Sequence, residues 1–169
     1  MSAVLSRGVA AHPKRLSTEH VFRPDGSKLI RVDQIPWTPW AIPGTYFKLL
    51  RVDDDAASMV LMLKVDPHSP APMHHHLGSA EVIILEGCFS YDYGTIRTGD
   101  YVFEPGGCSH DPTTHEEGAV MFAIIKGGLQ GVDENGEPSG PILDINWHCR
   151  TAAANGAAGH IRRPGLRSR

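Results

Sequence analysis

A run of three histidines in the middle of the chain could bind a metal ion. His74, His75 and His76 are consecutive, and successive side chains of a strand point to opposite faces. On a strand, His74 and His76 can therefore reach one ion, while His75 faces the other way. A third imidazole from another strand would leave coordination positions open, which is typical of a catalytic metal site. Taken alone, however, the run also fits a solvated histidine-rich turn.

The composition indicates one ordinary globular domain. The chain has 169 residues, of which 41% are hydrophobic and 21% charged, enough for one sizeable core. The net charge of -3 gives no electrostatic basis for binding nucleic acid or a membrane surface. The longest apolar run, residues 119–125, is far too short to span a bilayer. We therefore expect neither nucleic acid nor membrane as a partner.

The cysteines and the N-terminus favour a cytoplasmic protein. Cys88, Cys108 and Cys149 are an odd number without a paired spacing, which fits a reduced compartment better than a disulfide scaffold. Residues 1–18 are basic but lack the apolar core of a secretory signal. An organelle transit peptide is conceivable from their composition, and a loose N-terminal arm is the simpler interpretation.

Short β-forming segments separated by glycine and proline turns fill the body of the chain. We expect strands over residues 28–32, 45–52, 59–65, 81–85, 88–93, 101–104, 119–126 and 141–149. Gly87 is expected to turn the chain, and Asn135 and Gly136 predict a tight hairpin turn. Because no segment shows a convincing 3.6-residue period, the pattern predicts an all-β antiparallel sandwich or barrel.

We divide the chain into an N-terminal arm (1–27), a single all-β domain (28–150) and a C-terminal tail (151–169). Residues 35–44 contain three prolines, which exclude a helix or a central strand. Their two tryptophans, Trp37 and Trp40, are expected to cover an end of the core or to line a pocket. The tail is rich in alanine, glycine and arginine and has no acid, which favours a solvated, disordered end.

The stretch from Pro72 to His110 resembles the cupin superfamily. The second cupin motif is matched without a gap by Gly99, Pro105, Gly107 and His110. The first motif is matched by the histidine run, Glu81 and Gly87. This resemblance implies a double-stranded β-helix, the jelly-roll barrel, with a metal in its mouth. The implied ligands are His74, His76 and His110.

One carboxylate of the family pattern is out of place. The family commonly has one residue more between the Glu and the Gly than separates Glu81 from Gly87, and counting back from Gly87 places the ligand position at Ala80. Strand alternation puts Ala80, Ile84 and Glu86 on one face and Glu81 on the other. Unless a bulge intervenes, Glu81 is therefore expected to point away from the metal.

A three-histidine site is similar to that of the cupin dioxygenases that cleave C–C bonds in acetylacetone and dihydroxyacetophenone. Residues 43–51 and 133–136 extend this resemblance, and Thr114 departs from the longer second motif, which has Asn there. The resemblance implies a non-haem Fe(II)-dependent dioxygenase that uses O₂ on a small diketone or hydroxyketone. Three neutral imidazoles leave the ion its full +2 charge, which favours a chelating mono-anion such as an enolate.

Other side chains near the motifs have open roles. An acceptor should orient each ligand imidazole, and Glu104 and Glu81 are the acidic candidates. Tyr91, Tyr93 and Phe103 would line the pocket or simply form barrel core. Cys108 is expected to be buried like an apolar residue. The remaining histidines without a partner pattern are expected to be packed or exposed: His68, His115 and His148.

Two other functions fit a cupin with three histidines. Zn²⁺ in place of Fe(II) could activate a water for a hydrolase or an isomerase. A metal-dependent sensor, similar to the anti-sigma-factor type of cupin domain, is the second alternative. Such domains normally carry a partner-binding helical segment, and neither end of the chain shows an amphipathic stripe. Because cupins often pair through edge strands, we expect a homodimer.

Overall fold

The computed structural model describes residues 19–69, 72–110 and 116–163. The chain divides into two units, residues 1–31 and 32–169. In the described part of the first unit, β1 (Val21–Phe22) and β2 (Lys28–Leu29) form an antiparallel hairpin. The second unit contains the histidine run and all other elements.

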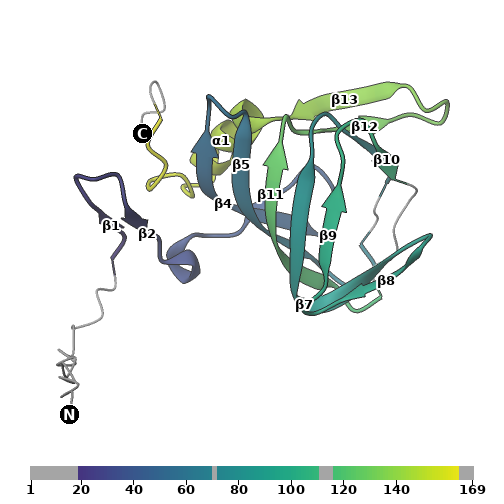
Figure 1. Cartoon of the computed structure of the whole chain (residues 1–169), viewed down its shortest axis with the longest axis horizontal. Coiled ribbons are helices and arrows are strands. Elements are labelled where there is room, and N and C mark those ends of the chain that lie inside the picture. Colours follow the sequence, from purple (N-terminus) through teal and green to yellow (C-terminus); the bar gives the residue numbers. More distant parts are fainter. Residues whose placement is uncertain (1–18, 70–71, 111–115, 164–169) are drawn as a thin grey trace, which may run out of the picture. The chain divides into compact units, whose positions relative to one another are not determined.

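Two antiparallel sheets form the body of the second unit (Figure 1). The larger follows the order β3-β4-β5-β11-β7-β8, with β9 also paired to β7, and the smaller follows β10-β6-β12-β13. The strands of the larger sheet are β3 (Thr38–Pro39), β4 (Thr45–Asp53), β5 (Ser58–Val65), β7 (Ala80–Tyr91), β8 (Gly94–Arg97), β9 (Tyr101–Glu104) and β11 (Ala119–Lys126). Those of the smaller are β6 (His74–His76), β10 (Ser109–His110), β12 (Leu129–Val132) and β13 (Pro138–Leu143). A short 3₁₀ helix, η1 (Val32–Gln34), precedes β3.

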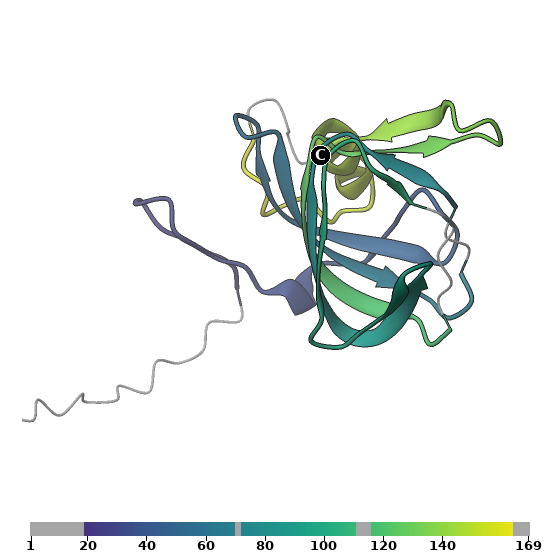
Figure 2. The same cartoon turned by 45° about the vertical axis from the view of Figure 1, so that its right-hand side comes forward.

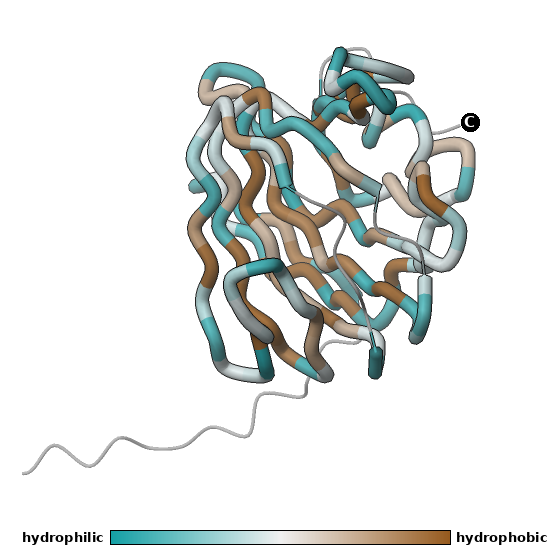
Figure 3. Tube along the Cα trace, turned by 90° about the vertical axis from the view of Figure 1, so that its right-hand side faces the viewer, coloured by the Kyte–Doolittle hydropathy of each residue, from teal (hydrophilic) through white to brown (hydrophobic). Residues whose placement is uncertain are grey.

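The strands wrap around a shared interior, as a second view shows (Figure 2). Buried and partly exposed residues alternate along β5 and β11, so one face of each strand is turned to the core. Leu61 and Ala123 are directly opposite each other in the ladder and fully buried. Along the trace, hydrophobic and hydrophilic residues alternate accordingly (Figure 3). The predicted all-β jelly-roll barrel is confirmed.

A bulge in β7 changes the alternation that the sequence suggested. The register with β11 shifts between Val120 and Met121, which pair with Glu86 and Ile84 and leave Leu85 as the extra residue. Leu85 and Glu86 are consequently both exposed, so the placement of Glu86 on the inner face is wrong.

Gly87 lies inside β7 and does not end a strand, in contrast to the expected turn. It has a φ of +73°, and a Cβ added there would approach the backbone oxygen of Gly118 to 2.1 Å. Only glycine combines this backbone conformation with so close a neighbour. Gly87 therefore lets one long strand bend between the two ends of the barrel.

The C-terminal part of the barrel differs from the expectation. The hairpin at Asn135 and Gly136 is confirmed as the connection between β12 and β13. The strand expected over 141–149 is wrong in its second half, because β13 ends at Leu143 and α1 (Ile145–Ala154) follows. Asp144 caps the helix by accepting a hydrogen bond from the Trp147 backbone N–H at 2.8 Å.

The buried residues of α1 have the helical spacing i, i+3, i+4 and i+7: Ile145, His148, Cys149 and Ala152. A 3.6-residue period is therefore present in this segment, although the apolar members include a histidine and a cysteine. That composition explains why the segment did not resemble a helix in sequence.

Residues 151–163 also differ from the expected loose tail. The chain after α1 packs on the barrel, with Ala157, Ala158 and Ile161 buried. The His160 imidazole is buried with its Nε2 2.7 Å from the backbone oxygen of Leu49. Residues 164–169, and 1–18 of the arm, lie outside the described residues.

In the described part of the chain, no helix is long and apolar enough to cross a bilayer. Cys88, Cys108 and Cys149 are all free thiols.

Candidate metal centre

The three histidines of the cupin-like motifs come together on the smaller sheet. β6 lies between β10 and β12, and His110 of β10 is directly opposite His74 of β6. Because β6 is extended, His74 and His76 point to the same side and His75 to the other. His75 accordingly contacts the Ser109 hydroxyl, with Nδ1 and Oγ 3.1 Å apart.

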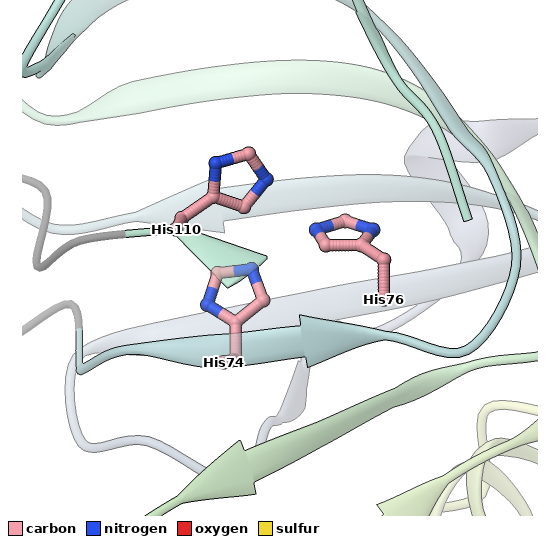
Figure 4. A group of neighbouring side chains, drawn as sticks. All are labelled: His74, His76 and His110. Carbon is pink, nitrogen blue, oxygen red and sulfur yellow. The ribbon is translucent and has the colours of Figure 1, made fainter. Parts of the chain in front are cut away.

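The imidazoles of His74, His76 and His110 face a common point (Figure 4). One nitrogen from each lies within 4.8 Å of the other two. Their ring centroids are separated by 4.9 to 5.3 Å. Metal–imidazole bonds of about 2.1 Å need only a small closure of these rings. The geometry is suited to one ion with three protein ligands.

His76 provides the strongest sign that the residues fit a metal. Its side chain is 2% exposed, and neither Nδ1 nor Nε2 has a hydrogen-bond partner among the residues that the structure describes. A buried polar atom without a partner is costly, and a bound ion is one of the recognised explanations. Burial lowers the pKa of His76 to about 4, so the imidazole is neutral with a lone pair available for a metal.

His74 is oriented by the backbone that precedes it. Its Nδ1 is 3.2 Å from the carbonyl oxygen of Pro72, and only a protonated Nδ1 can donate to that oxygen. Nε2 then carries the free lone pair, which is how outer contacts fix the tautomer of metal-binding histidines. Burial lowers the pKa of His74 as well, so it also favours the neutral ligand form.

A buried carboxylate, Glu104, lies beside the histidines. Its Oε1 lies 3.1 Å from Nε2 of His110. Its Oε2 lies 3.4 Å from Nε2 of His76, but this second contact does not have the geometry of a hydrogen bond. Glu104 is the cross-strand partner of Ala80, the position to which the motif spacing assigned the missing ligand. Of the two acidic candidates, the structure brings Glu104 to the site.

Glu81 points away from the site, as strand alternation predicted. Its carboxylate accepts a hydrogen bond from the Tyr101 hydroxyl at 3.1 Å on the outer face of the sheet. The bulge of β7 begins only after Ile84, so it does not alter the direction of Glu81.

Glu104 is held in its ionised form. Burial alone would raise its pKa, but hydrogen bonds from His110 and Tyr91 outweigh burial and lower it. The Tyr91 hydroxyl donates to Oε1 of Glu104, and burial together with this carboxylate raises the pKa of Tyr91. Tyr91 therefore stays a neutral phenol and a donor.

The expectation of a centre without a carboxylate needs correction. With ionised Glu104 in contact with two of the imidazoles, a divalent ion would give the site a net charge of +1 rather than +2. A mono-anionic chelating ligand would then neutralise the site.

His74 and His76 line a cavity of about 110 Å³ inside the barrel, which we call the histidine cavity. Its walls are mostly apolar and come from both sheets: Leu63, Val82, Phe89, Met121 and Ile125 from the larger sheet, and Leu129 from the smaller. The polar lining consists of His74, His76, Glu104, Tyr91 and Thr45, together with the indole of Trp40. No lysine or arginine lines it among the described residues, so a bound anion would depend on the metal for charge compensation.

The aromatic candidates divide between the cavity and the surface. Tyr91 and Trp40 line the histidine cavity, whereas Trp37 lies under the ammonium group of Lys48. Tyr93 stacks on Tyr91 but is 65% exposed. Phe103 is 55% exposed on the outer face, so its placement in the pocket or the core is wrong.

The remaining candidates are placed as follows. Cys108 is only partly buried, and its Sγ lies 3.8 Å from Nε2 of His110, so the expectation of a plain buried cysteine is wrong. His148 is packed, with no exposed surface. Thr114 and His115 lie outside the described residues.

Comparisons with known proteins agree with the observed fold. The family model of the ChrR cupin-like domain matches residues 25–129. An RmlC-like cupin protein from Ralstonia eutropha has a TM-score of 0.69 at 21% identity, covering 82% of this chain and 92% of its own. An acetylacetone dioxygenase from Acinetobacter johnsonii has a TM-score of 0.66 at 20% identity, covering 85% and 96%. At these identities, the structural likenesses show the fold alone.

The comparison with curated proteins found no match. The family assignment therefore depends on the family model, which spans more than half of the chain and includes the histidine run and β9. Together with the jelly-roll barrel and the histidines in its mouth, this match shows that the chain belongs to the family of ChrR cupin-like domains.

Proposed function

We propose that this protein is a non-haem Fe(II)-dependent dioxygenase that cleaves a C–C bond of a small diketone or hydroxyketone. The observation that carries the proposal is the group of three converging imidazoles, two of which line a mostly apolar cavity, with no hydrogen-bond partner for the buried nitrogens of His76 among the described residues. A fold shared with an acetylacetone dioxygenase from Acinetobacter johnsonii supports the choice of substrate class.

Each side chain has a defined task in this proposal. His74, His76 and His110 would hold the ion, and Glu104 would set the net charge of the site. When bound, Fe(II) would supply the reaction with O₂ and a chelation point for the two substrate oxygens. Tyr91 keeps Glu104 in place through its hydroxyl hydrogen bond. The apolar walls exclude water from the reacting centre, which strengthens electrostatic interactions there.

Oxygen consumption tests the proposal directly. Protein loaded with Fe(II) under anaerobic conditions should consume O₂ with acetylacetone or 2,4′-dihydroxyacetophenone and release a carboxylic acid. The matched variants are His76→Ala and His75→Ala, which change neighbouring residues on opposite faces of β6. We expect the first to abolish O₂ consumption and the second to retain it. An equal loss of O₂ consumption in both variants would show that the reaction does not depend specifically on the face of β6 that carries His74 and His76.

A second candidate function is a metal-dependent sensor, which the match to the ChrR cupin-like domain favours. Zinc in place of iron would support this role, or a hydrolase or isomerase. One feature counts against a sensor: α1 buries its apolar residues against its own barrel beside β4 and β13, so they do not form a docking stripe. Stoichiometric zinc in protein that consumes no O₂ would shift the assignment to this second group.

We also propose that the protein forms a homodimer through the outer face of the larger sheet. Four large apolar side chains lie there on adjacent strands with 41% to 57% exposure: Ile83, Leu85, Tyr101 and Phe103. Exposed apolar groups of this size mark interaction surfaces. Sedimentation velocity should show a dimer that Phe103→Glu converts to monomer, and a monomeric wild-type protein would contradict the proposal.

A further inference from the structure

A second cavity of about 180 Å³ adjoins the histidine cavity, and we call it the side cavity. The two share five lining residues: Trp40, Ile42, Pro72, His74 and Leu129. His74 is one of the three candidate ligands, so the junction between the cavities lies at the proposed metal position. Beyond the junction, the side cavity extends along β12 and β13, past Gly131, Ser139 and Leu143.

The sizes of the two cavities suggest a division of roles. A cavity of about 150 Å³ in an apolar protein interior is known to hold a benzene molecule. The histidine cavity is smaller than that, and an ion with a chelating group would occupy part of it. The side cavity exceeds this size. A substituent as large as a phenyl ring therefore finds more room beyond the junction than beside the histidines.

The chemistry of the side cavity selects an uncharged, apolar group. No charged side chain lines it among the described residues, and most of the wall is apolar. Its amide, Gln130, already donates to the carbonyl oxygen of Gly140 at 3.3 Å. A carboxylate or ammonium group on the substrate would find no opposite charge there, whereas an apolar group would gain contact with the apolar wall.

Trp40 forms the wall common to both cavities and is fixed from behind. Its Nε1–H donates to Nε2 of His148 at 3.1 Å, and the Nδ1 of His148 is 2.8 Å from the carbonyl oxygen of Asp144. His148 packs edge-on against Phe47, with ring centroids 4.9 Å apart. The imidazole is therefore held by a hydrogen bond at each nitrogen and by packing against Phe47, so α1 sets the position of the indole. A wall fixed in this way favours a ring or chain of defined thickness.

We propose that the side cavity is a substrate subsite that binds an apolar alkyl or aryl substituent while the chelating head lies at the three histidines. This inference rests on the proposed function for the position of the head. It names Trp40 as a specificity-determining residue and His148 as the positioning residue behind it. It also predicts a preference for substrates larger than acetylacetone.

The test compares two diketones with the same chelating head on protein loaded with redox-inert Zn²⁺. Acetylacetone carries a methyl group where 1-phenylbutane-1,3-dione carries a phenyl ring, and binding is measured by calorimetry. We expect the phenyl compound to bind at least roughly tenfold more tightly, from the additional apolar surface buried. Filling the side cavity with Ala41→Phe, or from the opposite wall with Ser139→Phe, should remove this preference and leave acetylacetone binding unchanged.

Ala41→Ser is the matched control, and it should retain the preference, because it adds little volume. Ala41 and Ser139 line the side cavity and are absent from the lining of the histidine cavity. Near-UV circular dichroism identifies which filled variants keep the native packing. A phenyl preference that persists in a folded, filled variant would overturn the subsite.

Acetophenone, which does not chelate, separates this inference from the proposed function. If neither diketone binds the Zn²⁺ form, the proposed function fails, and metal-free protein is titrated with acetophenone. Binding that both filled variants weaken would still support the subsite. Absence of binding to the wild-type protein, or equal binding to all variants, would refute it.

Discussion

Replacing Glu104 by glutamine should weaken metal binding by about 10- to 100-fold, the usual effect of removing an outer partner of a metal-ligating histidine. The change keeps the size of the side chain but removes its charge. The carboxylate oxygens lie 3.1 and 3.4 Å from Nε2 of His110 and His76, so a neutral amide there no longer offsets the charge of a divalent ion. The same range corresponds to about 1.4 to 2.7 kcal/mol.

Glu81→Gln is the matched control for this prediction. It makes the same chemical change on the outer face of β7, where the carboxylate contacts Tyr101 rather than the histidines. Affinity for Zn²⁺ is measured by competition with a chromophoric chelator at pH 7. We expect Glu81→Gln to bind as the wild type does. An unchanged affinity in Glu104→Gln, or an equal loss in both variants, would refute the reasoning that the buried carboxylate supports the ion.

Two further predictions concern stability. Burial lowers the pKa of His148 to about 4 from a usual value near 6.5, so the unfolded chain binds the extra proton first as pH falls. The contribution of the neutral imidazole to the free energy of unfolding is therefore complete above about pH 6.5 and is lost as the pH falls towards 4. The loss over the whole range is roughly 3 kcal/mol. His148→Phe should flatten the pH dependence of urea unfolding between pH 7 and 4.5, and a slope equal to that of the wild type would contradict this. Gly87→Ala should destabilise the fold by about 1 to 3 kcal/mol or more, because it adds a Cβ 2.1 Å from the Gly118 oxygen at a positive φ. An unchanged midpoint of thermal unfolding would show that β7 can relax there.

The sequence was most informative where side-chain spacing alone determines direction. His74 and His76 share a face because β6 is extended, and Glu81 points outward because it lies one residue from Ala80 on β7. The resemblance to the cupin motifs implied His110 as the third ligand, and the structure pairs it with His74. The first two inferences need only the alternation of side chains along a strand.

What the sequence missed depends on contacts between distant segments. Glu104 was one of two candidates, and only the pairing of β9 with β7 places it beside Ala80. The bulge at Leu85 is defined by the pairing of β7 with β11, which no local pattern reveals. α1 was predicted as a strand because its buried face includes His148, whose burial is possible only with a donor from Trp40 and an acceptor at Asp144.

The measurement that tests the central claim most directly is the metal content of anaerobically purified protein, beside His110→Ala prepared in the same way. His110 is opposite His74 in the ladder and supplies the third imidazole of the cluster. We predict about one iron per chain in the wild type and loss of that iron in the variant. Wild-type protein that binds no metal, or a variant that retains it in full, would contradict the assignment of these histidines as a metal centre.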